Sequence, residues 1–101
     1  MLGTWEFLGG AVRVTASGAG FAGVVTAKTS EGCSRPVGQH IWTIAARGAT
    51  YAGTHVTYLR PGCKAKTVAA TFAITQKQDT YTLNVCTGNV CTTHKRLKPP
   101  A

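Results

Sequence analysis

The stretch from Thr80 to Leu97, TYTLNVCTGNVCTTHKRL, is the most informative part of the sequence. Two runs of strand-forming residues flank Gly88-Asn89, a dipeptide suited to a type II′ turn. A two-residue loop fixes the pairing of the two strands, so that Cys86 lies opposite Cys91 at a separation that a disulfide can span. The stretch therefore predicts a β-hairpin closed by its own disulfide.

The face of this hairpin that points away from the cysteines is apolar on one strand and polar on the other. It carries Tyr81, Leu83, Val85, Thr92, His94 and Arg96. Such a face lies either at a strand edge in water or on the floor of a polar pocket.

The preceding segment decides between these two alternatives. Residues 67–75 alternate between apolar and small polar side chains, which is typical of a half-buried strand. A four-residue turn at 76–79 would place Ile74 opposite Tyr81, Phe72 opposite Leu83 and Ala70 opposite Val85. Because all of these pairs are apolar, we expect this face to lie in the core, with His94 and Arg96 inward or at a rim.

The rest of the chain alternates in the same way and shows no helical period. Further strands are expected at about 3–8, 11–16, 21–28, 39–47 and 50–59. A turn at Gly48-Ala49 would place Trp42 opposite His55. The 101 residues thus predict one all-β domain, in which seven or eight antiparallel strands form an up-and-down meander that closes into a small barrel. Residues 98–101 are expected to fray.

The four cysteines predict two disulfides. None of them forms a C-x-x-C motif, and their spacing does not fit a zinc site. The hairpin register favours Cys86–Cys91, which leaves Cys33–Cys63. An even number of cysteines in a small chain indicates an oxidising compartment, so we expect a secreted or extracytoplasmic protein. Cys33 lies in the longest loop, 29–38, which is either a lid over an opening or a connection held by its disulfide.

The charge is strongly asymmetric, with 11 Lys and Arg against three acids and a net charge of +8. Such a surface attracts anionic partners, and it also keeps a secreted domain soluble. The scarcity of acids argues against paired-carboxylate glycoside hydrolysis and against a calcium cage. No apolar run approaches the length that spans a bilayer.

Three stretches resemble an avidin-type or, more broadly, a calycin (lipocalin-type) barrel: residues 3–5, the pair of segments 41–44 and 51–54, and the closing run 80–98. The resemblance implies an antiparallel barrel with a ligand cavity at one mouth. The region that would match the biotin contacts of avidins holds Phe7, Leu8, Gly10 and Ala11. Those residues cannot supply the required hydrogen bonds, so biotin is not the expected ligand.

The candidate ligand-binding residues are aromatic or polar side chains that could face one interior. They are Trp42, His55, His40, His94, Arg96, Tyr51 and Tyr81. The alternative is an ordinary core with satisfied Tyr and His side chains at the barrel ends. Because neither H-x-H nor H-x-x-x-H occurs, we assign no metal site. We also assign no cofactor and no catalytic residue in the expected function.

The expected function is that of a secreted, non-catalytic protein that binds a small ligand or a protein partner. The first alternative is a basic barrel that binds nucleic acid or another polyanion. The second is a small hydrolase that uses His55 and His94 as general base and acid, with Arg96 as the cation.

Overall fold

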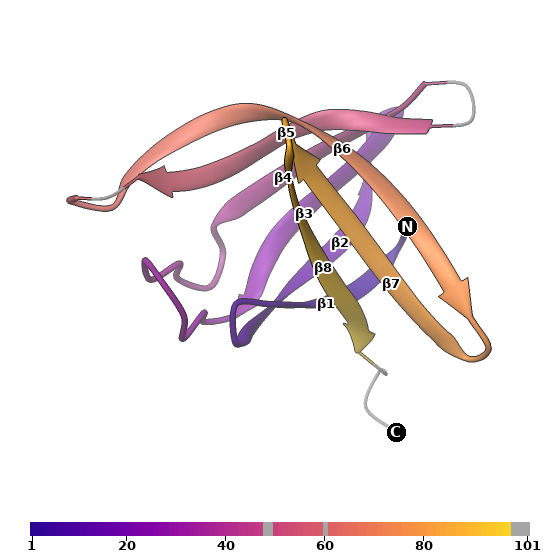
Figure 1. The fold of residues 1–101 in the computed structure, drawn as a ribbon, viewed down its shortest axis with the longest axis horizontal. Coiled ribbons are helices and arrows are strands. Elements are labelled where there is room, and N and C mark those ends of the chain that lie inside the picture. Colours follow the sequence, from indigo (N-terminus) through magenta and orange to yellow (C-terminus); the bar gives the residue numbers. More distant parts are fainter. Residues whose placement is uncertain (48–49, 60, 98–101) are drawn as a thin grey trace.

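The structure, a computed structural model, describes residues 1–47, 50–59 and 61–97 (Figure 1). Within them lie β1 (Gly3–Phe7), β2 (Gly10–Ser17), β3 (Gly20–Ala27), β4 (His40–Arg47), β5 (Thr50–Leu59), β6 (Lys64–Lys77), β7 (Thr80–Thr87) and β8 (Val90–Leu97). The expected turn at Gly48-Ala49, Arg60 and the expected frayed tail 98–101 lie outside the described residues.

The strands form one closed antiparallel barrel in which every strand pairs with its neighbours along the chain. Closure comes from β1 and β8, where Thr4 lies opposite Leu97 and Trp5 lies opposite Arg96. The predicted all-β up-and-down barrel is therefore confirmed. None of the described residues belongs to a helix that is long and apolar enough to cross a membrane.

Both predicted disulfides are confirmed. In the β7–β8 hairpin Cys86 lies opposite Cys91 and is bonded to it, and Gly88 has a φ of 63°, as the tight turn requires. The second disulfide joins Cys33 to Cys63 and so ties the loop 28–39 to the turn between β5 and β6.

The predicted pairing between β6 and β7 is wrong by two residues. Ile74 lies opposite Leu83 and Phe72 lies opposite Val85, because the turn holds only Gln78 and Asp79 and not four residues. Gln78 adopts a φ of 55°, a conformation that a non-glycine residue seldom takes, so the sequence did not indicate the tighter turn. A shift of two residues keeps every side chain on its predicted face.

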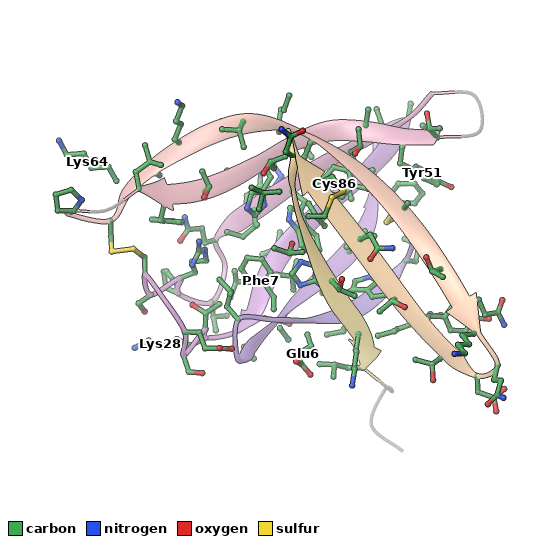
Figure 2. The ribbon with its side chains drawn as sticks, in the orientation of Figure 1. Glu6, Phe7, Lys28, Tyr51, Lys64 and Cys86 are labelled. Carbon is green, nitrogen blue, oxygen red and sulfur yellow. A yellow bond between two sulfur atoms is a disulfide. The ribbon has the colours of Figure 1, made fainter. Side chains whose placement is uncertain are left out.

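The interior of the barrel is filled by apolar side chains from β1, β2, β3, β4, β6 and β7, while β5 contributes only partly buried residues and β8 contributes the buried His94. The buried cluster is Trp5, Phe7, Val12, Val14, Val25, Ile41, Trp42, Ile44, Ala70, Phe72, Leu83 and Val85. Figure 2 shows Phe7 in the middle of the molecule. Removing each large side chain of this kind from water contributes about 1.5–3 kcal/mol, so the cluster supplies much of the stability of so small a domain.

The two ends of the barrel differ. One end carries the β1–β2, β5–β6 and β7–β8 turns together with the loop 28–39, and we call this end the mouth. The opposite end carries the β2–β3 and β6–β7 turns, the start of β1 and the end of β8. In Figure 1 the loop 28–39 lies at the lower left, away from both termini.

Candidate functional site at the mouth of the barrel

The loop 28–39 is held against the mouth on both of its sides. The backbone N–H groups of Ser30 and Glu31 donate to the carbonyl of Leu8 in the β1–β2 turn, at 2.9 and 3.1 Å. The backbone N–H of Gly38 donates to the carbonyl of Val25, at 2.8 Å, and the Cys33–Cys63 disulfide fixes the middle of the loop. The loop is therefore an ordered wall of the mouth.

A cavity of about 470 Å³ lies between this loop and the barrel wall. It is lined by Glu6, Phe7, Leu8, Glu31, Arg35, His55, Thr57, Thr92, Thr93 and His94. A second hollow of about 430 Å³ shares His55, Thr57 and Thr92 with the first and adds the apolar side chains of Val68, Val85 and Val90. Both volumes fall in the range of small-molecule sites.

A third hollow, of about 660 Å³, is lined by small residues that include Ala45, Ala52 and Thr71. No group that titrates lines it, because its one cysteine, Cys86, is in a disulfide. The chemistry is therefore concentrated at the mouth.

His55 is oriented by the core. It lies on β5 opposite Trp42 of β4, and the indole Nε1–H of Trp42 donates to its Nδ1 at 2.9 Å. Burial, together with the charges of Arg35 and His94, lowers the pKa of His55 from 6.5 to about 4. At neutral pH the ring is therefore uncharged and carries its proton on Nε2. That N–H has no hydrogen-bond acceptor among the described residues.

His94 is satisfied on both ring nitrogens. Its Nδ1–H donates to the backbone carbonyl of Glu6 at 3.0 Å, and its Nε2 accepts from the hydroxyl of Thr92 at 2.8 Å. Burial lowers the pKa of His94, while the hydrogen bond to Glu6 and the charge of Glu6 act in the opposite direction. The ring packs 5.3 Å from the ring of Phe7 and 5.4 Å from that of Trp42. It is thus a fixed, neutral part of the wall.

Arg35 brings a buried charge to the same cavity, because its side chain is only 6% exposed. The guanidinium carbon lies 4.6 Å from the ring centre of Tyr58 and 5.4 Å from that of Phe7. Its Nη1 donates to the carbonyl of Cys33 at 2.8 Å, whereas its Nε is enclosed and has no partner. Burial lowers the pKa of Arg35, partly offset by Tyr58, yet a guanidinium stays charged at any physiological pH.

The structure brings together three of the seven predicted site residues, Trp42, His55 and His94. Tyr51 packs against Phe21, and Tyr81 lies under Arg96, both at the end opposite the mouth. Figure 2 shows Tyr51 and Lys28 at opposite sides of the molecule. His40 is exposed and makes hydrogen bonds to the carbonyl of Trp42 and the hydroxyl of Thr43.

Sequence reasoning missed Arg35, Phe7, Thr57 and Thr92. The only signal was the loop itself, which is long, carries a disulfide and contains Arg35 next to Pro36. Among the described residues, no three His, Cys, Asp or Glu side chains converge in a way that could hold a metal ion.

Comparison of the chain with models of known protein families, with curated proteins and with solved structures finds no match. Any functional argument therefore rests on the geometry of the mouth.

Proposed function

We propose that this protein binds a small organic ligand in the mouth cavity, between the loop 28–39 and the barrel wall. The observation that carries the proposal is the buried, unpartnered Nε of Arg35, on a residue that lines this cavity beside His55, whose Nε2–H has no acceptor among the described residues. Buried polar groups are normally paired, so an unpaired buried donor on a residue that lines a cavity supports a ligand site there. A small calycin-like barrel secreted into an oxidising compartment accounts for the closed meander and for both disulfides.

The geometry favours binding over hydrolysis by the histidine pair. A general base needs a free lone pair that points at the substrate. The Nδ1 lone pair of His55 accepts from Trp42, its Nε2 carries the proton, and Nε2 of His94 accepts from Thr92. Arg96, the cation expected for that chemistry, lies at the opposite end of the barrel.

Binding of a polyanion lacks a comparable local feature. Among the described residues, the exposed cations are spread over different strands, with Arg13 on β2, Lys64 and Lys66 on β6 and Lys95 on β8. The net charge of +8 still attracts anions in general. Binding that falls steeply with salt and is insensitive to changes at the mouth would support the polyanion alternative.

A thermal-shift screen of small organic molecules tests the proposal. A ligand that binds only the folded state stabilises it by about 2.7 kcal/mol when it is present at a hundred times its Kd. We expect Thr57→Trp, which fills the region shared by the two hollows, to abolish the shift. Thr15→Trp, on the exposed face of β2, is the matched control and should leave it unchanged. If no compound stabilises the protein, or if Thr57→Trp has no effect on binding, the proposal is wrong.

A further inference from the structure

We propose that the ligand is an organic acid whose carboxylate binds Arg35. This inference rests on the proposed function and specifies the class of ligand that the mouth accepts.

The charge of Arg35 is unbalanced inside the protein. A buried cation is normally paired with an anion, because the loss of hydration is otherwise uncompensated. Glu6 and Glu31 line the same cavity, yet Arg35 makes no ion pair with any described residue. The ring faces of Tyr58 and Phe7 and one hydrogen bond to a carbonyl offset only part of this cost. An anionic group in the cavity would supply the missing partner.

The unpaired edge of the guanidinium has the donor geometry that a carboxylate needs. Nη1 is used by the carbonyl of Cys33, whereas neither Nε nor Nη2 makes a hydrogen bond to a described residue. Together Nε–H and Nη2–H form a planar pair of parallel donors of the kind that binds the two oxygens of a carboxylate. Because Nε is enclosed in this structure, bidentate binding requires the side chains around it to move aside, whereas Nη2 can be reached first.

His55 adds a third donor on the same cavity. Its Nε2–H faces no acceptor among the described residues, and the fixed tautomer prevents it from acting as an acceptor there. The ring is neutral, so it directs the carboxylate without repelling Arg35. The site thus offers donors and one positive charge, and it selects an oxyanion over a neutral or cationic group.

The other lining residues limit the rest of the ligand. The carboxylates of Glu6 and Glu31 at the cavity rim oppose a second negative charge, so a monocarboxylate is favoured over a phosphate dianion. Phe7 and Leu8 provide apolar surface near Arg35, and the adjoining hollow adds three valines: Val68, Val85 and Val90. A compact acid with an apolar body therefore fits both hollows.

Calorimetry with defined probes tests the inference. The probes are benzoate and hexanoate, their neutral amides, and inorganic phosphate. We expect at least one of the acids to bind about tenfold or more tightly than its amide and more tightly than phosphate. Glu31→Gln should strengthen binding of that acid, because it removes a like charge from the rim.

Variants of Arg35 identify the group responsible. Arg35→Gln should weaken binding of the acid about tenfold or more. Arg35→Lys should give an intermediate affinity, because lysine keeps the positive charge and lacks the planar pair of parallel N–H donors. Arg13→Gln removes the same charge from the exposed face of β2 and should change the affinity by less than about twofold at physiological salt. Thermal unfolding of each variant shows whether it is folded.

The outcomes separate the inference from the proposed function. If neutral molecules bind at the mouth as tightly as acids, or if Arg35→Gln and Glu31→Gln both leave acid binding unchanged, the carboxylate assignment is overturned while the ligand site stands. If phosphate binds more tightly than either acid, the preference for a monocarboxylate is overturned. If neither the acids nor any screened molecule binds, both proposals fail.

Discussion

The indole Nε1–H of Trp42 donates to Nδ1 of His55 at 2.9 Å, across the pair formed by β4 and β5. Trp42 is fully buried, so the most enclosed aromatic residue of the barrel sets the protonation state of a residue at the mouth. A tryptophan N–H can only donate, and it therefore forces the proton of neutral His55 onto Nε2. Core packing and the donor chemistry of the cavity are thus linked through one hydrogen bond.

Replacement of Trp42 by Phe should break this link. We expect a loss of about 2–4 kcal/mol of stability, from the smaller ring and from the unpaired Nδ1 of His55. Urea unfolding measures the loss, and nitrogen chemical shifts of the imidazole report the tautomer. Trp5→Phe is the control, because Trp5 is similarly buried and its indole donates to the backbone carbonyl of Met1, so the same loss of ring volume leaves the His55 hydrogen bond in place. Equal losses in the two variants, with His55 still protonated on Nε2, would contradict the assigned role.

Stability should decrease as the pH falls from 6.5 to about 4. The pKa of His55 is about 4 in the folded protein, against its ordinary value of 6.5 when unfolded, so the unfolded chain binds the proton first. The contribution of neutral His55 is complete above pH 6.5 and is lost across this interval. His94, whose pKa is also lowered, acts in the same direction. Because His55 is partly open to solvent, the expected loss from it is only about 1–2 kcal/mol.

Urea unfolding at a series of pH values measures this loss. The groups that face His55 are Arg35, His94 and the carboxylates of Glu6 and Glu31, so the variant must leave those four residues in place. His55→Gln should remove the larger part of the decrease in the free energy of unfolding between pH 6.5 and 4. A variant that loses as much stability on acidification as the parent protein would show that His55 is not the group responsible.

The sequence predicted the barrel because its physical determinants are local. Alternation of side chains, glycine turns and the Cys86–Cys91 register each act within one hairpin. The predicted β6–β7 register was wrong because the local sequence gave no sign of the tighter turn. Gln78 adopts a positive φ there, and the turn contains no glycine that would have indicated it. The change of two residues left Phe72 inside, so the core assignment survived the error.

The site was predicted less completely, for a physical reason. Trp42, His55 and His94 lie on strands, where register determines which side chains meet. Arg35 lies in a loop, and its position depends on contacts far apart in the sequence, such as the Cys33–Cys63 disulfide and the hydrogen bonds to Leu8. Alternation cannot separate the two ends of a barrel either. Tyr51, Tyr81 and Arg96 were therefore grouped with His55 although they lie at the other end.

The two disulfides should differ in their effects on stability and on binding. Cys33 and Cys63 are 30 residues apart, and the chain-entropy account gives about 3–4 kcal/mol for such a loop. Cys86 and Cys91 are five residues apart, and the same account gives about 2 kcal/mol. Replacement of each pair by Ala, followed by denaturant unfolding, measures both values.

Binding at the mouth gives a second comparison between these variants. Loss of the Cys33–Cys63 disulfide frees the loop that carries Arg35 and should therefore weaken binding of the acid. Loss of Cys86–Cys91, which lies on the β7–β8 hairpin, should weaken binding less. Comparable weakening in the two variants, at temperatures where both are folded, would argue that the loop does not form part of the site.

Gly53 provides the last test, because it lies opposite Ile44, two residues from His55 on β5. A Cβ at Gly53 would collide with the backbone carbonyl oxygen of Thr43, so the two strands would have to separate. We expect Gly53→Ala to cost about 3 kcal/mol or more, since a backbone atom cannot move aside as a flexible side chain can. The same displacement would lengthen the nearby Trp42–His55 hydrogen bond and weaken ligand binding in the variant that still folds.

Gly18→Ala is the matched control for this substitution. Gly18 lies in the β2–β3 turn at a φ of 56°, with nothing within 4 Å of the added carbon, so only backbone strain of about 1 kcal/mol is expected. Denaturant unfolding gives both losses, and calorimetry gives the affinity for the acid. If Gly53→Ala is no more destabilising than Gly18→Ala, β4 and β5 are not as close at this point as the structure shows. The rigid positioning of His55 by Trp42 would then lose its basis, since the approach of these two strands is what holds the indole against the imidazole.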